Sequence, residues 1–191
     1  QLTFILGKSG TGKSTSLRNF KKEDGIGYIT ATGKALPFKT DVPQMHAKNY
    51  PDLLNAIAKS KAEVMVIDDF NYFMSFEEFE KIGVTGYAKF GQMAQNVVSV
   101  INAITKKDGN QRFYIMAHSE DNEEGLLKLK TTGKMVTEKF VPEGLTNQVI
   151  ETALIDGEFV FKVKTDGRGI KTPLGMMDTE TLPNDLKELD N

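Results

Sequence analysis

The sequence predicts an α/β fold in which a mostly parallel sheet is covered by helices on both faces and extended by a C-terminal antiparallel hairpin. Three observations support this prediction. A short apolar run at residues 2–6 leads directly into a glycine-rich loop and a helix-like segment. Strand-like and helix-like segments then alternate to about residue 145, as they do in parallel sheets. Beyond that point, Asp156-Gly157 separates two strand-like runs and indicates a hairpin turn.

The first part of the chain is expected to supply two strands and two helices. Residues 2–6 are almost continuously apolar and end at a glycine, as buried parallel strands often do. A helix is predicted from about residue 13 to residue 22, and a second strand at residues 25–31. Residues 32–49 hold two prolines and are expected to form a loop. A second helix begins near Pro51, a residue type that is tolerated in a first helical turn.

The second part of the chain is expected to complete the sheet. A third strand at residues 63–69 is apolar until it ends in two aspartates, and residues 111–118 form a fourth. Two runs, 148–154 and 158–163, make the hairpin, and the tail from Pro173 is a loop with a short closing helix. Between the third and fourth strands, the longest helix is predicted by an apolar stripe with steps of three and four: Phe90, Met93, Ala94, Val97, Val98, Ile101 and Ile104.

Composition limits the possible functions. A chain of 191 residues suits one domain, residues 1–191, and no apolar run approaches the roughly 20 residues of a membrane-spanning helix, so we expect no membrane partner. The absence of cysteine excludes disulfides and thiolate chemistry and favours a reducing compartment such as the cytoplasm. With a net charge of −2, the chain has no global basic field, so nucleic-acid binding requires a local basic surface or an assembly.

The glycine-rich loop is the most specific motif. Residues 7–14 read GKSGTGKS and match the phosphate-binding pattern G-x-x-x-x-G-K-[ST] at every fixed position, with a strand before and a helix predicted after. Glycines let backbone N–H groups approach phosphate oxygens, and the dipole of the following helix adds to their field. The loop predicts a P-loop NTPase that binds ATP and Mg²⁺ through Gly7, Lys8, Ser9, Gly10, Thr11, Gly12, Lys13, Ser14 and Thr15.

Individual roles follow from the chemistry of the nucleotide. Lys13 is expected to interact with the β- and γ-phosphates, and the Ser14 hydroxyl to bind Mg²⁺. Asp68, at the acidic end of the third strand, is expected to be the second metal ligand, directly or through water. Asp69 is the candidate base that deprotonates the attacking water. The alternatives are a base at Glu77 or Glu78, or an Asp69 that only solvates or caps the following segment.

The fourth strand suggests one further site residue. If this strand lies between the loop strand and the acidic strand, its polar end reaches the γ-phosphate, because ligands gather at the carboxyl ends of parallel strands. His118 would then contact the γ-phosphate or the attacking water. The alternative is a histidine with a structural role.

Two groups of cations have less specific signals. Lys128, Lys130 and Lys134 are either an exposed edge or a source of charge for a neighbouring subunit's γ-phosphate. Arg168 and Lys171 lie in a glycine-rich stretch that could close over the nucleotide or contact a partner.

Residues 86–91, with two aromatics and a lysine among glycines, either contact single-stranded nucleic acid or, through Phe90, begin the core of the long helix.

Together these segments make the chain resemble the phage-encoded, RecA-like ATPases of the Sak type, which are linked to single-strand annealing and recombination. The resemblance covers nearly the whole chain and rests on residues 7–15, 66–70, 86–90, 117–120, 132–135, 171–176 and 183–186. It implies a RecA-like core, ATP hydrolysis, single-stranded DNA as partner, a homo-oligomer and, for a phage protein, the host cytoplasm. One feature departs from the family: RecA-type motors generally carry a catalytic glutamate at the end of the second strand, where residues 28–32 offer only hydroxyls.

Two other functions compete with a DNA-dependent ATPase. A P-loop kinase of nucleosides or nucleotides usually has an arginine-rich lid, and this chain has only Arg18, Arg112 and Arg168. A nucleotide-binding scaffold with little hydrolysis would explain the missing glutamate. The absence of a guanine-reading motif favours ATP over GTP.

Overall fold

The computed structural model describes residues 1–107, 110–132 and 141–190, which form an α/β fold with a mixed, mostly parallel sheet of nine strands. The strands are β1 (Leu2–Gly7), β2 (Ile26–Thr30), β3 (Gln44–His46), β4 (Val64–Asp68), β5 (Arg112–Asp121), β6 (Leu127–Leu129), β7 (Gln148–Ile155), β8 (Glu158–Lys162) and β9 (Thr181–Pro183). They lie in the order β3-β2-β4-β5-β1-β7-β8-β9, with β6 beside β5. The pairs from β3 to β7 are parallel, whereas β6, β8 and β9 pair antiparallel to their neighbours.

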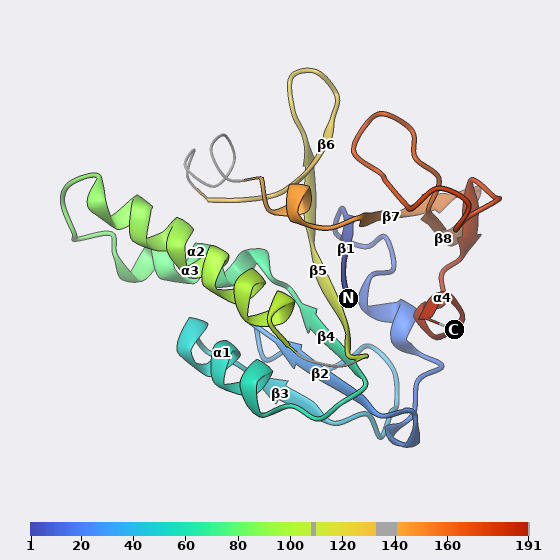
Figure 1. Cartoon of the computed structure of the whole chain (residues 1–191), viewed down its shortest axis with the longest axis horizontal. Helices are drawn as coiled ribbons and strands as arrows, with labels where there is room; N and C mark the ends of the chain where they lie inside the picture. Colours follow the sequence, from blue (N-terminus) through green and yellow to red (C-terminus); the bar gives the residue numbers. More distant parts are fainter. Residues whose placement is uncertain (108–109, 133–140, 191) are drawn as a thin grey trace.

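Helices cover both faces of this sheet (Figure 1). They are α1 (Tyr50–Lys59), α2 (Asn71–Glu80), α3 (Ala88–Thr105), α4 (Leu186–Asp190) and the short 3₁₀ helices η1 (Ser14–Leu17), η2 (Lys22–Asp24) and η4 (Pro142–Leu145). Helices α1, α2 and α3 pack on one face, and η1 and α4 pack on the other. Within the described ranges, no helix has both the length and the apolar character needed to cross a bilayer.

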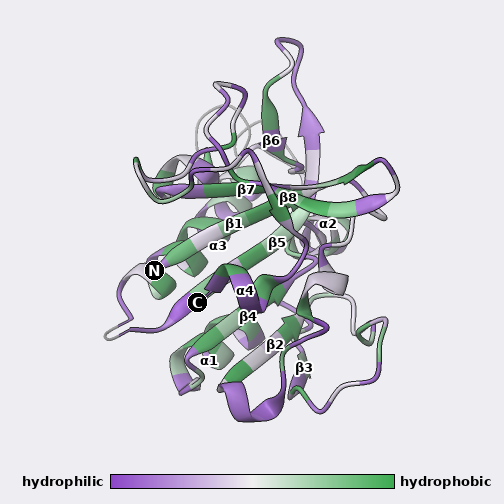
Figure 2. Cartoon of the chain, turned by 90° about the vertical axis from the view of Figure 1, so that its right-hand side faces the viewer, coloured by the Kyte–Doolittle hydropathy of each residue, from purple (hydrophilic) through white to green (hydrophobic). Residues whose placement is uncertain are grey.

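Each face of the sheet has its own apolar core, because side chains alternate along a strand. In β1, Phe4 and Leu6 face the core under α1 and α3, while Ile5 faces the core under η1 and α4. In β4, Ile67 faces the core under α1 and α3, and Val66 faces the core under η1 and α4. Figure 2 shows the resulting hydrophobic stretches along the central strands. The predicted α/β class, the mostly parallel sheet, the long helix α3 and the C-terminal hairpin are therefore confirmed.

The helix predicted from about residue 13 to residue 22 is wrong. Residues Ser14–Leu17 form a 3₁₀ turn, and the next helical residues are those of the separate 3₁₀ helix η2, which begins at Lys22. The Ser16 hydroxyl donates to the Lys13 carbonyl at 2.6 Å, so a side chain competes for a backbone acceptor of the first turn. Further on, Arg18 and Asn19 donate hydrogen bonds to the C-terminal segment, at the Asn184 carbonyl and the Asp185 carboxylate. These tertiary contacts take the place of the expected later α-helical turns, so only one short helical turn follows the loop.

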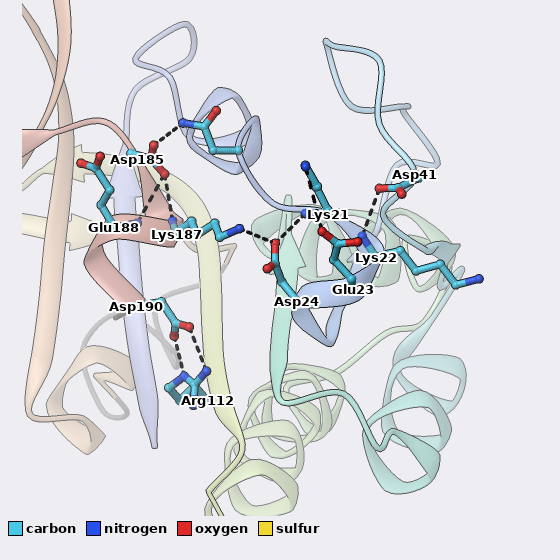
Figure 3. A network of polar contacts seen from close by, with 11 residues as sticks. Lys21, Lys22, Glu23, Asp24, Asp41, Arg112, Asp185, Lys187, Glu188 and Asp190 are labelled. Atoms are coloured by element: carbon cyan, nitrogen blue, oxygen red, sulfur yellow. Dashed lines mark hydrogen bonds and ion pairs between the residues drawn. The ribbon is translucent and has the colours of Figure 1, made fainter.

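The C-terminal helix α4 is attached to the body of the protein by ionic contacts (Figure 3). The Asp190 carboxylate accepts hydrogen bonds from Arg112 Nε and Nη2, at 2.6 and 2.9 Å, and from the Tyr114 hydroxyl at 2.8 Å. Lys187 Nζ donates to Asp24 at 2.8 Å. These contacts fix α4 against β5 and η2, and α4 also packs on η1.

Replacing Asp190 by Ala is expected to lower the free energy of unfolding by about 1–3 kcal/mol, because Arg112 and the Tyr114 hydroxyl lose their common partner. Urea unfolding followed by circular dichroism measures the change. The matched control is Glu188→Ala, since the Glu188 side chain is exposed on the same helix and should shift stability by less than about 0.5 kcal/mol. Equal midpoints for the two variants would contradict the assigned role of Asp190.

Candidate functional site

The candidate site lies where the carboxyl ends of three parallel strands meet. Strand β5 lies between β4 and β1, and His118 pairs in register with Gly7 at the end of β1. The fourth predicted strand therefore does lie between the loop strand and the acidic strand, as a site role for His118 requires. A cavity of about 320 Å³ opens here and is lined by Ser9, Gly10, Gly12, Lys13, Ser14, Thr15, Thr32, Lys34, Pro37, Asp69, Tyr72 and His118.

Lys13 is a buried cation at the bottom of the glycine-rich loop. Its ammonium group donates to the carbonyl oxygens of Gly7 and Lys8 at 2.8 and 2.9 Å, and the residue is 7% exposed. Burial lowers the pKa of Lys13, while the nearby carboxylates of Asp68 and Asp69 act in the opposite direction. A bound anion would favour the charged form of this lysine further.

The loop backbone depends on glycine at specific points. Gly10 and Gly12 adopt φ values of +78° and +92°, which side chains rarely allow. At Gly7 the restriction is steric, because a Cβ atom would lie 2.0 Å from Thr152 Oγ1 and 2.9 Å from the Thr152 carbonyl oxygen. The Thr11 hydroxyl also contacts the Thr152 hydroxyl, at 2.6 Å. The glycine-rich loop therefore packs against β7, at Thr152.

Gly7→Ala is therefore expected to destabilise the protein by about 1–3 kcal/mol, the usual effect of adding a methyl group to a filled site. Gly83→Ala is the control, because nothing lies within 4 Å of a Cβ atom there and its φ is not positive. Thermal unfolding of both variants makes the comparison. A Gly7→Ala variant as stable as Gly83→Ala would show that the loop does not pack on Thr152 as described.

Asp68 and Ser14 form the candidate metal-binding pair. The Ser14 hydroxyl donates to Asp68 Oδ2 at 2.6 Å, and the Tyr28 hydroxyl donates to the same oxygen at 2.9 Å. Asp68 is 1% exposed and also accepts a hydrogen bond from the Asp69 N–H, so its hydrogen-bonding partners among the described residues are all neutral. Burial is the main cause that raises the pKa of Asp68. A cation bound beside it would stabilise the ionised carboxylate.

Ser14 and Asp68 suit Mg²⁺, which binds few protein ligands, better than a metal ion whose ligands are all protein side chains. Among the described residues there is no cluster of three or more histidine, aspartate or glutamate side chains that could hold an ion. Magnesium usually takes one or two protein oxygens and completes its octahedron with phosphate and water oxygens. One buried carboxylate next to one hydroxyl agrees with that pattern.

Asp69 is held in an unusual backbone conformation at the edge of the cavity. Its φ is +58°, in the left-handed region, which aspartate tolerates better than most residues. The Thr32 hydroxyl donates to Asp69 Oδ2 at 2.7 Å. The carboxylate from the end of β4 is therefore fixed against the segment that follows β2. Neither alternative base lines the cavity: Glu77 accepts from Lys81 and from Asn96 on α3, and Glu78 lies on the same helix, α2.

His118, on the neighbouring strand β5, also lines the cavity. Its backbone N–H donates to Asn71 Oδ1 at 3.1 Å, and its ring meets the Tyr72 ring edge-on with 5.9 Å between centroids. Burial, followed by the charge of Lys13, lowers the pKa of His118. The imidazole is thus neutral at neutral pH and can both donate and accept a hydrogen bond.

Of the five remaining candidate cations, the four that the structure describes do not line the phosphate cavity of their own chain. Lys128 lies on β6 opposite Glu120, and the Lys130 N–H donates to the His118 carbonyl at 2.8 Å. Arg168 lies 3.8 Å from Asp121, and the backbone of Lys171 pairs with that of Val149. Lys134 lies outside the described residues. A role for these cations at a neighbouring subunit's nucleotide remains a prediction.

Several site residues were not predicted from the sequence. Tyr28 and Thr32, on and just after β2, hold the two aspartates, and Lys34 and Tyr72 line the cavity. The rule that ligands gather at the carboxyl ends of parallel strands could have identified Thr32. Lys34 and Pro37 had no such signal, because they lie in an irregular loop.

No protein-family model matches the chain, and no curated protein matches it either. The functional assignment therefore depends on the residues of the cavity.

Proposed function

We propose that this chain is a P-loop ATPase with a RecA-like core that binds ATP together with Mg²⁺ at the cavity around Lys13 and acts on single-stranded DNA. One observation carries the proposal. A buried lysine within a glycine-rich loop lies next to a serine hydroxyl that is hydrogen bonded to a buried aspartate. This is the set of groups that a triphosphate and its cation require: loop N–H groups and an ammonium for phosphate oxygens, and two hard oxygens for the metal.

Each residue has a role in the proposed hydrolysis. Lys13 binds the β- and γ-phosphate oxygens, and the His118 imidazole donates a hydrogen bond to the γ-phosphate. Asp69 accepts a proton from water while the water oxygen bonds to the γ-phosphorus and the bond to the leaving ADP oxygen breaks. Mg²⁺, held by Ser14 and Asp68, would neutralise phosphate charge.

The contact between Thr32 and Asp69 shows which carboxylate lies where RecA-type motors have a glutamate, at the end of the second strand. Thr32 follows β2 and donates to Asp69 at 2.7 Å, so a carboxylate lies beside the end of that strand although β4 supplies it. The base required for hydrolysis can therefore come from the acidic strand. This favours an ATPase over a scaffold that only binds nucleotide.

The segment from the end of α2 to the start of α3, residues 79–89, supports a nucleic-acid partner. Phe79, in α2, is 70% exposed, Tyr87, between the two helices, is 91% exposed, and Lys89 lies in the first turn of α3. Exposed aromatics beside lysines can stack bases and neutralise backbone phosphates. Phe90 is half-buried and the fully buried stripe of α3 begins at Met93, so the two functions considered for this segment are compatible.

A homo-oligomer is part of the proposal. Lys128, Lys130, Arg168 and Lys171 do not line the cavity of their own chain, and we infer that they supply charge to the γ-phosphate bound by a neighbouring chain. A small-molecule kinase is less well supported, because all three arginines belong to the described residues and none lines this cavity.

ATP turnover with and without single-stranded DNA tests the proposal. We expect phosphate release that depends on Mg²⁺ and increases with DNA. Phosphate transferred to an added nucleoside, with no effect of DNA, would identify a kinase instead. Tight ATP binding without product under either condition would identify a scaffold.

A further inference from the structure

A second cavity, of about 560 Å³, lies next to the phosphate cavity and is within the size range of ligand pockets. Its lining includes Thr15, Arg18, Phe159, Leu182 and Asn184. Thr15 also lines the phosphate cavity, so the two spaces lie on either side of this residue. A triphosphate in the first cavity would place the rest of the nucleotide near the second.

Asn184 has an unsatisfied amide at this cavity. The residue is 3% exposed, and among the described residues neither its side-chain oxygen nor its side-chain nitrogen has a hydrogen-bonding partner. A buried polar group without a partner costs about 1–3 kcal/mol, so such groups are usually satisfied by a ligand or water. Because both amide atoms are free, the side chain offers one donor and one acceptor.

The backbone around Asn184 is firmly held, so the amide is presented in a fixed place. Arg18 donates to the Asn184 carbonyl oxygen, and Asn19 donates to the Asp185 carboxylate. The contacts of Lys187 and Asp190 fix α4 immediately beyond (Figure 3). A backbone that is already fixed holds the Asn184 side chain in one place, as a residue that distinguishes between ligands requires.

Two further contacts place the amide against the phosphate loop. A Cβ atom on Gly12 would lie 3.1 Å from Asn184 Oδ1 and 3.0 Å from Cγ of the Phe159 ring. Phe159 is 42% exposed and lines the cavity, where its ring can meet a planar ligand. The cavity thus combines an aromatic surface with a donor and an acceptor next to the loop.

We propose that Asn184 is the residue that selects adenine, and that Phe159 contacts the face of the base. This inference rests on the proposed binding of a nucleoside triphosphate. Adenine presents its N6 amine, a donor, beside N7, an acceptor, and this edge matches the amide oxygen and amide nitrogen in a bidentate pair. Hypoxanthine and guanine present two acceptors at the same edge, O6 and N7, so neither orientation of the amide can satisfy both.

Equilibrium binding of ATP and of inosine triphosphate by the wild-type protein is the first test. The two nucleotides differ in the base at position 6 and its neighbouring ring nitrogen, so their affinity ratio isolates base recognition. We expect ATP to bind about tenfold or more tightly, the discrimination that a good bidentate amide contact provides. If the wild-type protein bound ATP and inosine triphosphate with equal affinity, Asn184 could not be the residue that selects adenine.

Two substitutions then connect the ratio to Asn184. Asn184→Ala removes both groups and Asn184→Asp removes only the donor, and both are expected to bring the ratio close to one. Asn102→Ala, at an exposed position of α3, is the matched control and should keep the wild-type ratio. A wild-type ratio in folded Asn184→Ala would overturn the inference even if the wild type prefers ATP.

Binding of inorganic tripolyphosphate separates this inference from the proposed function. A protein that binds tripolyphosphate, ATP and inosine triphosphate equally well retains the proposed phosphate site but has no adenine selection by Asn184. A protein that binds none of the three overturns both proposals. Thermal unfolding of each variant shows whether a changed ratio reflects the loss of the amide or the loss of the fold.

Discussion

Asp69→Asn is expected to lower ATP turnover by about 10²–10⁴-fold while ATP still binds, because proton transfer by a positioned carboxylate typically contributes that factor. The substitution changes little else. Asparagine tolerates the left-handed backbone at φ +58° as well as aspartate does, and its side-chain oxygen can still accept from the Thr32 hydroxyl. The variant therefore removes the basic carboxylate, while the side chain at position 69 stays in the same place.

Phosphate release under saturating ATP and Mg²⁺, together with nucleotide binding measured by calorimetry, checks this prediction. The matched control is Asp178→Asn, since Asp178 is exposed in the C-terminal segment and should leave both quantities unchanged. Turnover at the wild-type rate in Asp69→Asn would exclude Asp69 as the base. A loss of ATP binding would indicate that Asp69 positions the nucleotide or its cation.

Lys13→Ala is expected to weaken ATP binding by about 30-fold or more, which corresponds to the roughly 2–5 kcal/mol lost when one member of a buried charged pair is truncated. Among the described residues, the ammonium group is hydrogen bonded to the carbonyl oxygens of Gly7 and Lys8 and not to a carboxylate, so phosphate oxygens need only replace neutral acceptors. Turnover should fall with binding.

Lys59→Ala, at the exposed C-terminal end of α1, is the control for the loss of a lysine. Thermal unfolding without nucleotide distinguishes a binding defect from an unfolded variant. Full ATP affinity in a folded Lys13→Ala protein would contradict the assignment of the phosphate site.

Features encoded by short-range patterns were predictable. The apolar strands, the stripe of α3 and the hairpin at Asp156-Gly157 follow from periodicity and turn chemistry, and β7 and β8 pair across that turn, with Ile155 opposite Glu158. The fixed spacing of the glycine-rich loop likewise identified Lys13 and Ser14. The converging ends of parallel strands then brought Asp68, Asp69 and His118 to the same region.

Features that depend on distant parts of the chain were not predictable. The helix expected after the loop is shortened because Arg18 and Asn19 bond to residues 166 positions away, which local propensity does not register. Helix α2 was missed because its aromatic residues lie on both its buried and its exposed sides, so no single apolar stripe stands out; Phe73 is 2% exposed and Phe79 is 70% exposed. The left-handed conformation of Asp69 had no sequence signal either.

The most direct test of the central claim is the location of a bound nucleotide in a crystal structure of the protein with Mg²⁺ and a non-hydrolysable ATP analogue. We predict that the triphosphate lies in the cavity lined by Lys13, Asp69 and His118, with the metal at Ser14 and Asp68. Density for the triphosphate at any other place, with this cavity filled only by water, would contradict the proposed function.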